Sequence, residues 1–254
     1  MSQTESAICR LRATIIGVTR PIPALKFRTL VFALATVLFT GFAAQSVRAQ
    51  FLHPKIKSKE TTIRNVVVFP ARVNVVRDSM KGPEGMAAES DELSARVEKI
   101  IAEVLSKEKQ VVTLAAPGMT STDGDSSRRY NIADFQTKYD DLLTKIMKKR
   151  SDVKKGRFSM GDEVLNLNLE KSADAILFIR GEGKKLTGGK TAFTLLVGGM
   201  PAYLKLQIGI VDARNGDVLL YTDPVFAGDP TTAVDRLRNA LKKGFKKLPP
   251  ASVQ

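Results

Sequence analysis

The chain has 254 residues, of which 43% are hydrophobic and 26% charged, and its formal net charge is +14. This balance is typical of a globular protein and argues against a disordered chain or a collagen. With one cysteine and one histidine, the chain is short of ligands for a zinc site and of bases for a Ser-His-Asp or Cys-His centre. We therefore expect no metal or cofactor, and composition weighs against most enzyme classes.

The amino terminus has the pattern of a secretory signal. Residues 30–44 contain no charged side chain, and several arginines and lysines precede them. Small residues then stand three and one positions before Gln50, at Val47 and Ala49. A basic flank, a short apolar core and a small-residue exit are typical of a cleaved signal peptide. We therefore predict that residues 1–49 are a signal peptide and that cleavage falls between Ala49 and Gln50.

The alternative is that residues 30–44 remain as an uncleaved membrane anchor. That run has fifteen residues, whereas a helix that spans a bilayer needs about 20. Cleavage would also remove Cys9, so the mature chain would form no disulfide and carry no lipid on a cysteine. We therefore expect a periplasmic or outer-envelope protein with no integral membrane span.

The first half of the mature chain indicates a strand, a helix and a second strand. Residues 63–76 are rich in β-branched side chains, which predicts a strand that ends or bends at Pro70. Residues 81–86 are predicted to be a loop. A helix capped by Ser90 should follow, and then a strand over residues 110–115 that pairs in parallel with the first.

The second half predicts two more helices, over residues 132–149 and 161–171, followed by several strands. The strands are predicted over residues 173–179, 192–197, 203–211 and 218–222. The dipeptide Asn215-Gly216 is a strong hairpin signal and should join the last two strands. A terminal amphipathic helix should follow a cap at Asp229 or Thr231.

The predicted order of elements is β-α-β-α-α-β-β-β-β-α. This order favours a single α/β domain whose mixed sheet begins with a parallel βαβ unit, ends in antiparallel hairpins and is flanked by helices. The domain is expected over residues 63–248, with a flexible basic lead-in over residues 50–62 and a short tail over residues 249–254.

Residues 181–191 (GEGKKLTGGKT) resemble a phosphate-binding loop without matching it. That loop needs GxxxxGK[ST], which would place its first glycine where Lys184 stands. A helix should also follow the loop, and residues 192–197 favour a strand instead. We therefore predict a basic hairpin loop that does not bind nucleotide.

Lysines form a candidate patch for an anionic partner, with a simple solvated face as the alternative. Aromatic residues are only 6% of the chain, too few to suggest the stacking platform of a nucleic-acid binder, so no nucleic acid is expected. The patch would comprise Lys184, Lys185 and Lys190 in the expected loop, with Lys242, Lys243, Lys246 and Lys247 in the last helix.

Two segments, SADAILFIRGEG and LKLQIGIVDARNGDVLLYTD, together with the terminal amphipathic helix, resemble the CsgG-like class of bacterial envelope proteins. That class shares a fold with the amino-terminal domain of TolB and with LpoB-type activators. In its hairpin motif, Asn215 replaces the usual Thr and Tyr221 the usual Trp. The resemblance implies a non-catalytic assembly or regulatory protein that binds an envelope protein, with a homo-oligomer as one possibility.

Three functions therefore remain open at this stage. The favoured one is docking of a protein partner, for which apolar residues beside a Gly-Gly turn form a candidate docking edge. The second is binding of an anionic envelope polymer through the lysines, and the third is a hydrolase that uses an unrecognised pair of carboxylates. The candidate docking edge comprises Leu195, Leu196, Val197 and Met200.

The signal prediction is tested by amino-terminal sequencing of the protein isolated from envelope fractions. We expect a mature chain that begins at Gln50, because Ala49 completes the small-residue exit. A product in the cytoplasm that still begins at Met1 would contradict the prediction.

Overall fold

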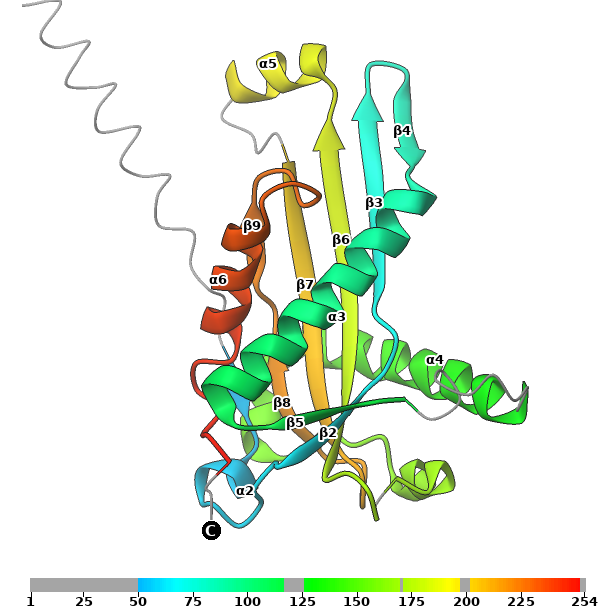
Figure 1. Cartoon of the computed structure of the whole chain (residues 1–254), viewed down its shortest axis with the longest axis vertical. Helices are drawn as coiled ribbons and strands as arrows, with labels where there is room; N and C mark the ends of the chain where they lie inside the picture. Colours follow the sequence, from blue (N-terminus) through cyan, green and yellow to red (C-terminus); the bar gives the residue numbers. More distant parts are fainter. Residues whose placement is uncertain (1–49, 117–125, 170, 197–201, 252–254) are drawn as a thin grey trace, which may run out of the picture. The chain divides into compact units, whose positions relative to one another are not determined.

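The computed structural model describes residues 50–116, 126–169, 171–196 and 202–251. Within these ranges, nine strands form one mixed sheet (Figure 1). The strands are β1 (Phe51–Leu52), β2 (Asn65–Val68), β3 (Arg72–Ser79), β4 (Gly82–Gly85), β5 (Val112–Ala115), β6 (Ala175–Leu186), β7 (Ala202–Asp212), β8 (Val218–Thr222) and β9 (Val225–Ala227).

Helices pack on both faces of this sheet, which confirms the predicted mixed α/β domain. In Figure 1, α3 crosses one face and α4 lies on the other. The helices are α2 (Pro54–Lys57), α3 (Ala87–Lys109), α4 (Ser126–Lys148), α5 (Gly188–Leu196) and α6 (Val234–Gly244), with 3-10 helices η1 (Arg150–Lys155) and η2 (Asp162–Leu167).

Strand β6 lies at the centre of the sheet and bonds to neighbours on both sides. β2 and then β3 run parallel along one edge of β6, and β7 runs antiparallel along the other. The predicted bend at Pro70 falls between β2 and β3, where an extra residue shifts the register against β6 from Val68↔Leu177 to Arg72↔Arg180. A proline is tolerated at such a bulge because the bulged residue is unpaired, so no backbone N–H is needed there for the hydrogen bonds between strands.

Two hydrophobic cores hold the helices against the sheet. One lies between the sheet and α3 with α6, and it includes Ile101, Leu206 and Leu241. The other lies under α4 and includes Phe178, whose ring stacks on Tyr139 with centroids 4.4 Å apart. The apolar sides of α3, α4 and α6 are therefore buried against the sheet.

The outer edge of β3 is covered by polar side chains of α3. The backbone N–H groups of Ala71, Val73 and Val75 donate to Glu98 Oε1, Ser94 Oγ and Ser90 Oγ, at 2.6, 3.1 and 2.9 Å. Residues four apart on a helix advance by about 6 Å and residues two apart on a strand by about 6.6 Å, so the two rows stay in step. This arrangement blocks the pairing of another strand along that stretch of β3.

Several local predictions are confirmed. β5 pairs in parallel with β2, as expected for a βαβ unit, and β7 pairs antiparallel with β8 around the turn that contains Asn215 and Gly216. The side chain of Asn215 accepts from the N–H of Asp217 at 2.9 Å, and Gly216 takes a positive φ of 75°. Asparagine and glycine suit this turn because each tolerates or stabilises such a backbone.

Other predictions are wrong in the structure. The expected loop over residues 81–86 forms β4, which pairs with β3, and the expected strand over residues 192–197 falls largely within α5. Short apolar runs without alternation do not distinguish helix from strand. Ser90 does not cap α3 but bonds to Met86 O and to β3, and α6 begins after Ala233 rather than at Asp229 or Thr231. The expected helix over residues 161–171 appears as η2.

Part of the expected lead-in forms secondary structure. Residues 50–58, which we call the N-terminal strap, contain β1 and α2 and pack onto the domain. β1 pairs with β8 through Phe51↔Tyr221 and Leu52↔Leu220. Gln50 is buried, donates to Lys243 O and accepts from the N–H of Lys247 at 2.5 Å. The basic composition of residues 50–62 gives no indication of these side-chain and backbone bonds to distant segments.

Gly209 tests the packing of α4 on the sheet. A Cβ at position 209 would overlap Tyr139 Oη and lie 2.8 Å from two ring carbons of Tyr139. We therefore expect Gly209→Ala to lower the free energy of unfolding by roughly 1–3 kcal/mol, measured by urea denaturation. Gly85→Ala is the matched control, because no atom lies within 4 Å of its added Cβ. Equal effects of the two substitutions would contradict this account of the packing.

Candidate functional site

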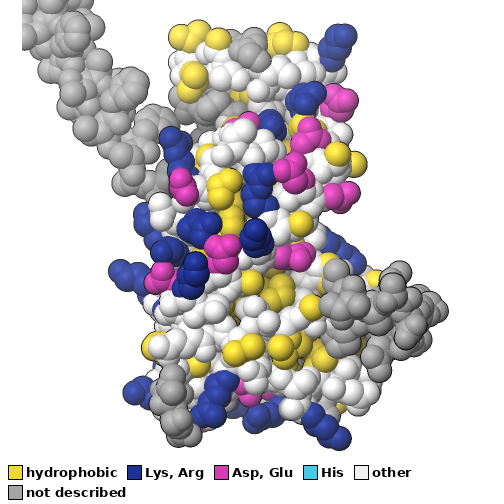
Figure 2. Space-filling model, viewed as in Figure 1, with side chains coloured by type: hydrophobic (Ala, Val, Ile, Leu, Met, Phe, Trp, Pro, Cys, Tyr) yellow, Lys and Arg dark blue, Asp and Glu magenta, His cyan; other side chains and the backbone are white. Residues whose placement is uncertain are grey.

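The most exposed large apolar side chains of the described residues gather at one end of the sheet. Leu196 and Leu195 on α5 are 85% and 57% exposed, and Met80 in the β3–β4 turn is 79% exposed. We call these three residues the apolar tip. Figure 2 shows hydrophobic side chains along that end, over α5. Exposed apolar groups that cluster in this way are typical of an interaction surface.

Asp78 ties α5 to the end of β3. Its carboxylate pairs with Lys184 at 2.7 Å and with Lys190 of α5, and its backbone carbonyl accepts from the N–H of Thr187 at 3.3 Å. These lysine hydrogen bonds hold the pKa of Asp78 below its ordinary value of 3.8. One carboxylate therefore neutralises one of two cations and fixes the start of α5 relative to the sheet.

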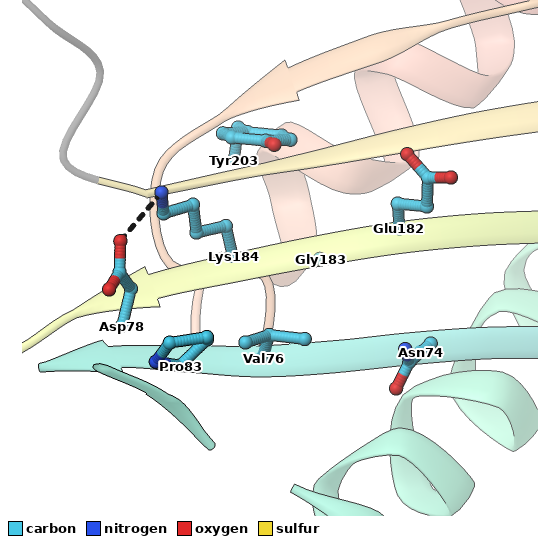
Figure 3. A pocket seen from close by; sticks show the side chains of 8 residues that line it. All are labelled: Asn74, Val76, Asp78, Pro83, Glu182, Gly183, Lys184 and Tyr203. Atoms are coloured by element: carbon cyan, nitrogen blue, oxygen red, sulfur yellow. Dashed lines mark ion pairs between the residues drawn. The ribbon is translucent and has the colours of Figure 1, made fainter. Parts of the chain in front are cut away.

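A shallow groove of about 440 Å³ lies beside the apolar tip. Its polar side chains project from the face of the sheet opposite α3. On this face, cross-strand register aligns Asn74 with Glu182 and Lys184 with Tyr203. Figure 3 shows Tyr203, Lys184 and Glu182 along neighbouring strands of this groove, with Asp78 at its end. The groove thus presents a polar, partly aromatic wall next to exposed leucines.

The groove contains two carboxylates, which bears on the hydrolase reading. A glycosidase-type pair needs one carboxyl whose pKa is raised so that it can donate a proton. Asp78 has a lowered pKa because two lysines bond to it, so it does not suit that role beside Glu182. Among the described residues, no group of three or more His, Cys, Asp or Glu side chains could hold a metal ion.

The structure changes one reason for rejecting a phosphate-binding loop and leaves the other. A helix, α5, does follow the glycine-rich segment, contrary to the sequence prediction. However, residues up to Leu186 lie in β6, where Gly183 is in register with both Val75 and Leu204. Backbone groups engaged in strand pairing cannot wrap a phosphate. Lys190, which would contact the phosphate, pairs with Asp78 instead.

The seven lysines of the candidate patch do not form one surface. Lys184 and Lys190 share Asp78, and Lys185 pairs with Asp229 at 3.2 Å. Lys242 pairs with Glu108 at 2.7 Å. The remaining three lysines make no side-chain ion pair within the described part of the chain; they are Lys243, Lys246 and Lys247.

The two groups of lysines lie at opposite ends of α3. Arg77, the neighbour of Asp78, pairs with Glu89 in the first turn of α3 at 3.9 Å, whereas Lys242 pairs with Glu108 in its last turn. Nineteen residues of helix separate the two acids, which is about 28 Å. The candidate lysines therefore form two separate groups, and binding of an anionic partner by either group stays a prediction.

Half of the candidate docking edge can be placed. Leu195 and Leu196 are exposed on α5, while Val197 and Met200 lie outside the described residues. Sequence reasoning missed Met80 and Asp78, which the structure brings to the same end from more than a hundred residues away along the chain. No local signal marks these two residues, because their role depends on the pairing of β3 with β6.

No helix of the described residues is long and apolar enough to cross a membrane. No protein-family model matches the sequence, and no curated protein sequence matches it.

Solved structures resemble the chain at low identity. A PelC dodecamer from Paraburkholderia phytofirmans is 12% identical with a TM-score of 0.37, covering 74% of this chain and 88% of that chain. The lipoprotein GNA1162 from Neisseria meningitidis is also 12% identical, with a TM-score of 0.36 and coverage of 72% and 96%. At these TM-scores the likeness supports no functional argument. The resemblance to the CsgG-like class therefore stays a prediction.

Asp78→Asn tests the tie between α5 and the sheet. At neutral pH we expect a lower free energy of unfolding, because two ammonium groups lose their shared carboxylate. The pKa of Asp78 is lowered in the folded protein, so this stabilisation is present above about 3.8 and lost as the pH falls through the lowered value. Urea unfolding at neutral and at strongly acidic pH should show the difference shrink. Glu182→Gln, on the same face, is the control, and an equal loss there would contradict the assignment.

Proposed function

We propose that this chain is an exported, non-catalytic protein of the bacterial cell envelope that docks a protein partner through the apolar tip, as an assembly or regulatory component. The observation that carries the proposal is the exposure of Leu196, Leu195 and Met80 at one end of the sheet. Burying a leucine or methionine side chain in an interface contributes about 1.5–3 kcal/mol, so these three residues could anchor a specific contact.

The surroundings of the apolar tip favour a protein partner over a polyanion. Lys184 and Lys190 share the carboxylate of Asp78, so these three groups leave one net positive charge next to the leucines rather than a cationic cluster. The adjacent groove offers Asn74, Glu182 and Tyr203 as hydrogen-bonding groups. An apolar centre with a polar rim is the usual anatomy of a protein interface. The partner could be a different envelope protein or a second copy of this chain.

A second function has its own observation. Lys243, Lys246 and Lys247 lack side-chain ion pairs within the described residues and stand close together at the end of α6. This cluster supports the alternative in which the protein binds an anionic envelope polymer. Such binding would weaken steeply as salt increases, whereas apolar docking would not.

The two functions are separated by pull-down from envelope extract at low and high salt. We expect a protein partner to be retained at high salt and lost with Leu195→Ser/Leu196→Ser, with at least a tenfold weaker affinity once the partner is identified. Leu165→Ser is the matched control, because Leu165 is also exposed but lies on η2.

Two outcomes would contradict the docking proposal. One is binding that disappears at high salt and in a Lys243→Gln/Lys246→Gln/Lys247→Gln variant, which would favour the polymer. The other is equal retention by the double leucine variant and by the wild type. If the retained partner is the chain itself, size-exclusion chromatography of the leucine variant should show the loss of the oligomer.

A further inference from the structure

His53, the single histidine of the chain, lies in the N-terminal strap and is 5% exposed. Its backbone N–H donates to Leu219 O on β8 at 2.9 Å. Its Nδ1 accepts from the backbone N–H of Lys55 at 3.2 Å, at the start of α2. A ring nitrogen that accepts a hydrogen bond carries no proton, so this geometry requires the neutral imidazole with its proton on Nε2.

The other side of the imidazole ring is confined by Gly156, which follows η1. A Cβ at position 156 would overlap His53 Nε2 and lie 3.1 Å from Cε1. The ring therefore fills a slot between α2 and the end of η1, with little room to turn. If Nδ1 were protonated, its N–H would face the backbone N–H of Lys55, and two hydrogen-bond donors would repel each other. The ring could relieve this repulsion only by leaving the slot.

The imidazole also joins the strap to the domain. On either side of it, β1 pairs with β8, and Ile56 of α2 is buried in the core under α3. Lys55 pairs with Asp217 at 2.8 Å, beside the turn between β7 and β8. Because β1 has two residues and α2 has four, these elements cannot stay ordered by themselves and depend on such contacts.

Charged groups around His53 oppose one another. Burial lowers the pKa of His53 from 6.5; Asp217, Asp212 and Glu60 raise it, and Lys55 lowers it further. On the η1 side, Asp152 is already paired with Lys155 and Arg157. The net direction is downward, so the docked strap favours the neutral imidazole.

We propose that His53 is a pH-sensitive latch and that protonation of its imidazole releases the N-terminal strap from β8 in mildly acidic solution. The docked state is fully stabilised above the free histidine value of 6.5, and this stabilisation is lost as the pH falls toward the lowered value in the docked state. Release would uncover the outer edge of β8 at Leu220 and Tyr221, where β1 is paired. An uncovered strand edge is open to pairing with another chain.

The protonation of His53 can be measured directly because the chain has one histidine. In protein prepared without a histidine tag, the single imidazole Cε1–H signal is followed by NMR across the acidic range. We expect a titration midpoint below 6.5, in the direction that burial imposes. A midpoint at or above 6.5 would overturn the proposal.

Release of the strap is measured by amide hydrogen exchange, corrected for the intrinsic rate at each pH. Between about pH 7.5 and 5.5, protection of residues 51–57 should fall by up to about tenfold, the limit that one pH unit below the free histidine value sets. Protection of β7 should not change over the same interval. Unchanged protection of the strap would overturn the proposal.

His53→Asn is the matched variant, because asparagine can accept from the Lys55 N–H as a helix cap but does not titrate. We expect this variant to keep the strap protected at both pH values. If its protection falls as much as in the wild type, another group is responsible and the latch is disproved.

Gly156→Ala gives a second reading in case the asparagine does not reproduce the cap. The added Cβ would occupy the slot of the imidazole, so the strap should lose protection even at about pH 7.5 while β7 keeps it. Full protection of the strap in this variant would show that the slot does not hold the strap.

Discussion

The pairing of β6 along both of its edges is the constraint on which the rest of the structure depends. β2, β3 and β7 all take their register from this strand. Its first half is buried on both faces, which explains the uninterrupted apolar run at the start of β6. Gly181 has to be small, because a Cβ there would lie 2.8 Å from Leu206 and 2.9 Å from Val73. Farther along, Lys184 carries the same strand into the groove, so the core and the candidate site share one element.

The fold could be predicted where the deciding signals are local, and not where they are distant. Asn215 and Gly216 stabilise their turn within a few residues, so the β7–β8 hairpin was predictable. By contrast, Lys190 of α5 meets Asp78 across 112 positions, and an apolar segment without alternation gave no sign of that contact. The N-terminal strap is a similar case, since Gln50 bonds to residues 193 and 197 positions away. Composition alone made that segment look like a solvated lead-in.

The candidate site shows the same division. Leu195 and Leu196 could be proposed from the sequence because an apolar run beside glycines stands out in a basic chain. The lysines could also be proposed from the sequence, but the structure pairs four of the seven with acids. Whether a surface charge is free to bind a ligand depends on its neighbours in space. A surface ion pair contributes little to the stability of the fold, but it occupies a charge that could otherwise bind a ligand. The function favoured by the geometry therefore rests on exposed apolar area rather than on net charge.

The apolar tip and the strap respond to different conditions, because different groups hold them. In mildly acidic solution Asp78 stays ionised, since its pKa is lowered, and the ion pairs that fix α5 remain. Over the same interval His53 gains a proton and the strap loses its hold on β8, whereas salt acts on the lysines rather than on a buried neutral ring. The two regions are joined by β7, which pairs with β6 at Ala202 beside the tip and with β8 at Gly209, opposite Tyr221. β7 therefore connects the strap to the tip within the sheet, and a second connection runs along α6, whose end bonds to Gln50 of the strap and whose preceding loop pairs Asp229 with Lys185.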